Sequence, residues 1–78
     1  MQCSGTYYFN DKRQLTIRPS KYHNHYKSFW VSDENGNWIG NLHKLKNGKV
    51  EACPDMHPCC QFENPFLALD YIKKCIYN

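Results

Sequence analysis

The alternation of apolar and polar residues predicts short strands over the first two thirds of the chain. Alternation with a period of two is clearest at residues 15–17, 29–31 and 38–42, and it is typical of strands that bury one face. The pairs Asn35-Gly36 and Asn47-Gly48 are strong hairpin signals, because both residue types tolerate the positive φ angles of tight turns. We expect strands at residues 6–9, 14–18, 26–32, 37–45 and 49–53.

The last segment predicts one helix, at residues 64–76. Asn64 is a favourable N-cap, and Pro65 suits the first helical position, where its missing N–H has no intrahelical partner. Apolar residues then recur at helical spacing and form a stripe that can pack on the sheet: Phe66, Ala68, Leu69, Ile72, Cys75 and Ile76. The expected fold is α+β, an antiparallel β-meander of four to five strands with one C-terminal α-helix packed on one face, in a single domain over residues 1–78.

The chain of 78 residues is rich in aromatic side chains, with six Tyr, four Phe and two Trp. These rings supply a large apolar area, so we expect a folded domain. A chain this short buries only about 60–65% of its unfolded surface, and a deep active-site pocket is not expected. No apolar run approaches the roughly 18 residues that cross a bilayer, and the first residues lack a charged-then-apolar signal layout. We therefore expect a cytoplasmic protein without membrane contact.

Positive charge is concentrated in the middle of the chain. The net charge is +3, but residues 12–49 hold eight Lys or Arg against Asp33 and Glu34, which gives this stretch a charge of +6. A basic segment favours anionic partners, either nucleic acid or an acidic protein surface. An ordinary solvated surface is the alternative explanation.

Basic and aromatic residues interleave between residues 21 and 30, a composition that suits a docking surface. Strand alternation places Lys27 and Trp30 on opposite faces, and we expect Phe29, Trp30 and Trp38 each to lie in the core. The polar loop before this strand is free of that constraint. The candidate binding residues are Lys21, Tyr22, His23, His25, Tyr26, Lys27, Lys44, Lys46 and Lys49.

Four potential zinc ligands fall within eight residues: Cys53, His57, Cys59 and Cys60. Zinc prefers sulfur and imidazole ligands, and His43 or Cys75 could complete such a site. Adjacent Cys59 and Cys60 would project oppositely from an extended strand, however. The cysteine count is odd and no export signal is present, so a disulfide framework is not expected. The main interpretation includes no metal and no cofactor, and a zinc-stapled module is an alternative.

The sequence carries weak signals for catalysis. Nucleophilic catalysis needs a base beside the nucleophile and an oxyanion site, and no spacing in the chain indicates either. A ribonuclease that uses His23, His25 or His43 as acid and base is chemically conceivable. Glycine-rich phosphate loops and paired catalytic carboxylates are absent from the sequence. We expect a protein that is not an enzyme.

Three strands followed by a helix that opens Phe62-Glu63-Asn64-Pro65 and continues Ala68-Leu69-Asp70-Tyr71-Ile72 resemble the DNA-binding domains of plant ethylene-response factors and phage integrase arm-binding domains. This likeness of layout covers residues 26–76 and implies a sheet inserted into the major groove. Those families carry several arginines on the strands, whereas residues 26–53 contain none, and arginine supplies the commonest bidentate base contact. In size and plan the chain also resembles small phage-encoded inhibitors such as anti-CRISPR proteins, which implies occlusion of a surface on a larger nucleoprotein. Neither likeness transfers a functional residue.

Together these features predict a small, non-enzymatic binding module. The favoured hypothesis is a protein-binding inhibitor or adaptor that occludes an acidic surface of a larger host complex and buries about 1,200–2,000 Å². The alternative is direct DNA or RNA binding through the basic central segment. The unpaired edge strands of so small a sheet would also permit a homodimer.

Overall fold

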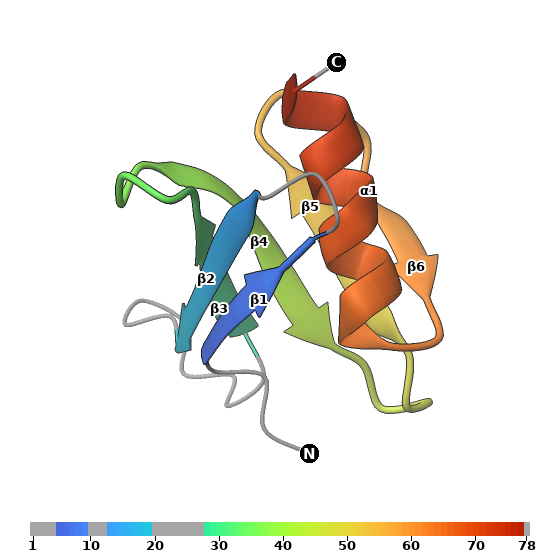
Figure 1. The fold of residues 1–78 in the computed structure, drawn as a ribbon. Helices are drawn as coiled ribbons and strands as arrows, with labels where there is room; N and C mark the ends of the chain where they lie inside the picture. Colours follow the sequence, from blue (N-terminus) through green and yellow to red (C-terminus); the bar gives the residue numbers. More distant parts are fainter. Residues whose placement is uncertain (1–4, 10–12, 20–27, 78) are drawn as a thin grey trace.

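The computed structural model describes residues 5–9, 13–19 and 28–77. They form a six-stranded antiparallel sheet whose strands follow chain order, with one helix packed on it (Figure 1). The strands are β1 (Gly5–Tyr8), β2 (Gln14–Pro19), β3 (Ser28–Ser32), β4 (Trp38–Lys44), β5 (Val50–Pro54) and β6 (Cys60–Phe62), and the helix is α1 (Pro65–Tyr77). The α+β meander with a C-terminal helix is confirmed, with one strand more than the sequence predicts.

The additional strand, β6, is only three residues long. It contains no β-branched residue, so its sequence does not predict a strand. It forms because the chain reverses after β5, where the His57 N–H donates to the Pro54 carbonyl at 3.2 Å and Met56 adopts a φ of 61°. The sheet therefore ends in a short edge strand whose position depends on this turn.

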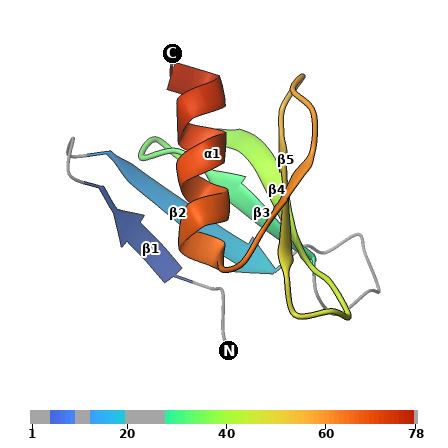
Figure 2. The same cartoon turned by 90° about the vertical axis from the view of Figure 1, so that its right-hand side faces the viewer.

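Helix α1 begins at the predicted cap. The Asn64 Oδ1 accepts a hydrogen bond from the Leu67 N–H at 2.9 Å, which satisfies one of the donors left without a partner at a helix start. The helix packs against β4, β5 and β6 and lies along one face of the sheet (Figure 2). Phe66 was expected in the core but is 49% exposed, and it stacks on Phe9 with ring centroids 5.3 Å apart. The buried helix residues are Pro65, Ala68, Leu69 and Ile72.

The hydrophobic core lies between α1 and the side of the sheet that faces it. Each strand from β2 to β5 contributes to it, and the side chains fully removed from water supply about 1.5–3 kcal/mol each. The buried apolar residues are Phe9, Leu15, Ile17, Val31, Ile39, Leu42, Val50, Ala52, Ala68, Leu69 and Ile72. One layer of side chains thus joins the helix to the sheet.

A register shift between β3 and β4 decides which residues of β4 face outward. Val31 pairs with Gly40, but the next residue, Ser32, pairs with Trp38. The extra residue reverses the side-chain alternation at the start of β4. Ile39 is therefore buried, at 7% exposure, while Trp38 is 47% exposed. The expectation that Trp38 is a core residue on the same face as Gly40 is wrong for this reason.

The Asp33 carboxylate holds the turn between β3 and β4. Its Oδ1 accepts hydrogen bonds from the Asn35 N–H at 2.9 Å and the Asn37 N–H at 2.8 Å. Burial acts to raise the pKa of Asp33, but hydrogen bonds from Asn37, Asn35 and Gly36 to the ionised form outweigh it, so the pKa lies below the ordinary value of an aspartate. Gly36 has a φ of 85°, as the predicted Asn-Gly turn requires.

We expect the substitution Asp33→Ala to lower the free energy of unfolding at pH 7 by about 1 kcal/mol. The folded-state pKa is depressed, so this stabilisation is present above the unfolded pKa of about 3.9 and disappears as the pH falls through the folded value. Urea denaturation at pH 7 and below pH 3 measures the difference between variant and wild type. Asp55→Ala, at an exposed turn carboxylate, is the control. A deficit that does not change with pH would contradict this role.

We expect Gly40→Ala to destabilise the protein by about 1–3 kcal/mol because the strands leave no room for a side chain. A Cβ at Gly40 would lie 2.8 Å from the Cys53 carbonyl oxygen and 3.0 Å from the Pro54 Cα, both backbone atoms. Chemical denaturation measures the loss, and Gln14→Ala at an exposed strand position should change stability by less than about 0.5 kcal/mol. A Gly40→Ala protein as stable as the wild type would disprove the close approach.

Candidate functional site

The face of the sheet opposite α1, which we call the open face, gathers polar and aromatic side chains. Paired residues of neighbouring strands point to the same side, and residues next to the core positions point away from the helix. Two adjacent cross-strand rows result: Arg18, Trp30, Asn41 and Cys53 form the first, and Ser28, His43 and Glu51 form the second. The register shift adds Trp38, and the pair Thr6 and Thr16 lies toward the β1 edge.

Trp30, Trp38 and Asn41 line a shallow hollow of about 240 Å³ on the open face. The Trp38 Nε1–H donates to the Asn41 Oδ1 at 3.1 Å, which holds the exposed indole beside Trp30. Trp30 is half-buried here, whereas Phe29 points the other way and packs against the core. Of the three aromatic residues expected in the core, only Phe29 contributes to it. An apolar hollow of this size suits one side chain of a partner.

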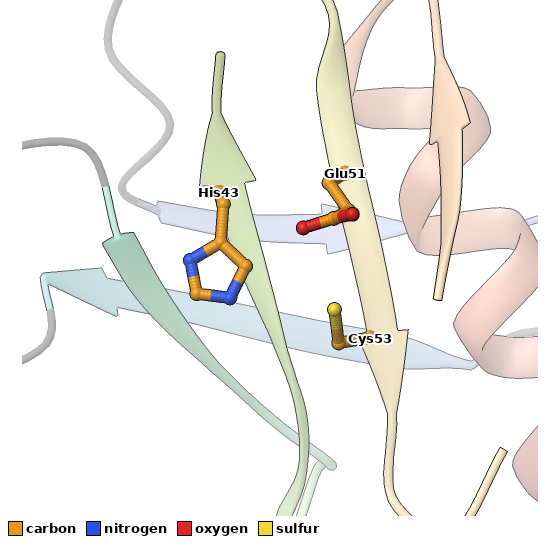
Figure 3. Close-up of side chains that lie close together, drawn as sticks. All are labelled: His43, Glu51 and Cys53. Carbon is orange, nitrogen blue, oxygen red and sulfur yellow. The ribbon is translucent and has the colours of Figure 1, made fainter. Parts of the chain in front are cut away.

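A second group on the open face brings together His43, Glu51 and Cys53 (Figure 3). Their ligand atoms lie within 4.8 Å of one another, and all three residues are half-buried. The His43 Nδ1 lies 2.9 Å from the Ser28 Oγ, and Figure 3 shows the other ring nitrogen on the side of Cys53. A set of imidazole, carboxylate and sulfur donors suits a transition metal better than magnesium or calcium.

Cys53 is also bonded to Cys59, with a Cα–Cα distance of 4.2 Å. Ala52 pairs with Cys60, so the same register places Cys59 directly opposite Cys53. The sequence predicts no disulfide framework, and the described residues contain this one bond. Cysteine count and export signals do not reveal this pair, because the hairpin between β5 and β6 creates the proximity.

Tyr71 connects α1 to the turn between β5 and β6. Its hydroxyl donates to the Pro58 carbonyl at 2.6 Å. A contact with the Cys60 sulfur raises the pKa of Tyr71, with burial and Cys75 acting in the same direction. Cys60 and Cys75 are free thiols. Cys60 pairs with the core residue Ala52, and Cys75 is part of α1. Both thiols therefore lie on the helix side of the sheet and not on the open face.

The four zinc ligands suggested by spacing do not converge. Cys53 and Cys59 share the open face, Cys60 lies on the other side, and His57 is exposed in the turn. Among the described residues, the His, Cys, Asp and Glu side chains that approach as a group of three are instead His43, Glu51 and Cys53. The sequence offers His43 as a supplementary ligand, but no signal in the sequence indicates Glu51.

Three of the nine predicted docking residues fall within the described residues. The other six lie outside them: Lys21, Tyr22, His23, His25, Tyr26 and Lys27. Lys44 is half-buried at the end of β4, and Lys46 and Lys49 are exposed in the turn that follows. Lys49 pairs with Glu63 at 3.7 Å. Sequence reasoning missed Arg18, Asn41 and the outward orientation of Trp38, which depend on strand register.

We expect Cys59→Ser to lower the free energy of unfolding by about 2 kcal/mol, the value for a disulfide that closes so short a loop. Denaturation without reductant measures the loss. Wild-type protein with reductant should show the same decrease, and Cys59→Ser should not respond to reductant. Cys60→Ser, at a free thiol, should keep the wild-type response; if it did not, Cys60 rather than Cys59 would be the bonded residue.

Within the described residues, no helix has the length and apolar character needed to cross a membrane. Comparisons with protein-family models, curated proteins and solved structures found no match to this chain.

Proposed function

We propose that this chain is a small, non-catalytic binding module that docks its open face on a protein with an acidic surface, as an inhibitor or adaptor. The observation that carries the proposal is the indole of Trp38, 47% exposed beside Trp30 at the rim of a hollow. Tryptophan and arginine are the residues that most often dominate the energy of protein interfaces. An exposed aromatic group beside an apolar hollow marks a surface suited to contact.

The hollow is organised before any partner arrives. The hydrogen bond between Trp38 and Asn41 and the register shift of β4 fix the indole. A side chain that is already held loses little conformational entropy on binding. The fixed position of the Trp38 indole therefore favours a role in specific docking over the chance exposure of an apolar ring.

The charge beside the hollow supports an acidic partner. Arg18 is exposed beside Trp30 in the same cross-strand row. Lys46 is exposed farther away, in the turn between β4 and β5. Neither forms an ion pair with another described residue. Glu51 is the one carboxylate in the described open face. Cations around an aromatic centre accelerate and orient association with an acidic surface.

Six of the predicted docking residues lie between Pro19 and Ser28, outside the described residues. Pro19 pairs with Phe29, and Ser28 pairs with His43 next to Lys44. These two flanking residues thus lie near the end of β4. The contribution of Lys21, His23 and Lys27 stays a prediction.

Nucleic-acid binding is a second candidate, because two neighbouring indoles can stack on unpaired bases. Such stacking supplies about 1–3 kcal/mol per base, with lysines contacting the phosphates. Glu51 on the same face repels phosphate, and Arg18 is the sole arginine of the described open face. These features favour the protein partner.

The test is affinity capture with the full chain from a lysate of the source cells, followed by titration of the purified captured protein. We expect Trp38→Ala to weaken its binding tenfold or more, as loss of a residue worth about 2 kcal/mol requires. Arg18→Glu should slow association, and the effect should decrease at high salt.

Leu67→Ala is the matched control, because Leu67 is 44% exposed on α1, away from the open face. It should bind like the wild type. Equal loss in Leu67→Ala and Trp38→Ala would contradict the proposed surface. Binding to labelled single-stranded DNA or RNA that falls log-linearly with salt, without a protein partner, would establish the second candidate instead.

A further inference from the structure

We infer that His43, Glu51, Cys53 and Cys59 form a zinc site that is available only when the disulfide between Cys53 and Cys59 is reduced. The site is on the open face, but its formation does not depend on the docking proposal. Oxidised and reduced proteins would differ in what holds the end of the sheet together: a covalent bond in one state and a metal ion in the other.

The register of β4 and β5 supplies three of the ligands. His43 and Glu51 are direct cross-strand partners, and Cys53 is two residues from Glu51 on the same face. Their ligand atoms lie within 4.8 Å of one another. Atoms bound to one tetrahedral zinc at about 2.0–2.3 Å are about 3.3–3.8 Å apart. Small side-chain rotations would therefore bring the three onto a common ion.

Cys59 supplies the fourth ligand because the hairpin holds its sulfur against that of Cys53. The two Cα atoms are 4.2 Å apart. Once the bond is broken, the two sulfurs can separate to the roughly 3.8 Å found when both bind one zinc, without movement of the strands. The resulting set of two thiolates, one imidazole and one carboxylate is complete for tetrahedral coordination.

The orientation of His43 also suits a metal ligand. Its Nδ1 lies 2.9 Å from the Ser28 Oγ, and the opposite ring nitrogen is on the side of Cys53 (Figure 3). When Nδ1–H donates to the hydroxyl, Nε2 is the ring nitrogen that carries the lone pair and would bind the ion. Histidine ligands of zinc characteristically have their second nitrogen held in this way.

A dithiol can reduce the disulfide between Cys53 and Cys59. Two electrons and two protons pass from the dithiol to the sulfurs of Cys53 and Cys59, which breaks their bond, and the reductant becomes a disulfide. Zinc then replaces both thiol protons, which leave to solvent, and two zinc–sulfur bonds form. Because a sulfur in the disulfide is not a thiolate, the covalent bond and the metal exclude each other.

The donor set identifies the metal class. Two thiolates and an imidazole are soft or borderline ligands that select zinc over magnesium or calcium. Four protein ligands leave no open coordination position for a substrate, which is the arrangement of structural zinc sites. The bound ion would restore a connection between β5 and the segment leading to β6 that reduction removes.

The experiment titrates the full chain with Co²⁺, a spectroscopic substitute for zinc, after reduction with a phosphine that does not compete for the metal. The phosphine takes an oxygen atom from water to become a phosphine oxide, and the two protons of that water go to the sulfurs of Cys53 and Cys59. We expect the reduced protein to bind one equivalent, with thiolate-to-cobalt charge-transfer absorption that one equivalent of Zn²⁺ abolishes. Disulfide-bonded protein should show neither change. Zinc should also raise the melting temperature of the reduced protein and leave that of the oxidised protein unchanged.

Variants assign the ligands. His43→Ala and Glu51→Gln occupy half-buried surface positions, and each should weaken zinc affinity tenfold or more in the reduced protein. Cys59→Ser should reduce the charge-transfer intensity. The matched controls are His57→Ala, Glu63→Gln and Cys60→Ser, which should bind like the wild type.

Three results would overturn the inference. The first is equal metal binding by oxidised and reduced protein. The second is a reduced, folded protein that takes up no cobalt or zinc. The third is loss of binding in His57→Ala or Cys60→Ser while His43→Ala and Glu51→Gln bind normally, which would locate the metal at the ligands suggested by sequence spacing.

Discussion

One short helix can bury only one face of a six-stranded sheet, and among the described residues no second helix covers the opposite face. Helix α1 has 13 residues, a length of about 20 Å, and packs on β4, β5 and β6. The core is therefore a single layer between helix and sheet. The tryptophan hollow and the group of His43, Glu51 and Cys53 both lie on the opposite face.

The hairpin of β3 and β4 connects stability to the proposed docking surface. The Asp33 turn fixes where β4 begins, and the register shift that follows exchanges the orientations of Trp38 and Ile39. Ile39 then fills the core while Trp38 faces out. Tight packing of Gly40 against the backbone of β5 holds β4 in this position, so the same contacts that stabilise the sheet also position the exposed indole.

Cys53 forms the disulfide and is also a ligand of the proposed zinc site. Its sulfur is bonded to Cys59 and lies within reach of His43 and Glu51. A disulfide around so short a loop contributes about 2 kcal/mol, a large share of the stability of a domain of this size. The Tyr71 hydrogen bond to the Pro58 carbonyl joins this hairpin to α1. The disulfide and the proposed zinc site therefore both lie in a hairpin that is bonded directly to the helix.

The sequence by itself determined the antiparallel meander, its Asn-Gly turns and the start of the helix at Asn64 and Pro65, because these depend on alternation, turn chemistry and capping within a few neighbouring residues. It did not determine β6, which is only three residues long and contains no β-branched residue, or the partition of the cysteines between the two sides of the sheet. Only the tertiary structure decided the exposure of Trp38 and the meeting of His43, Glu51 and Cys53. Both depend on strand register, and a shift of one residue moves a side chain to the other face.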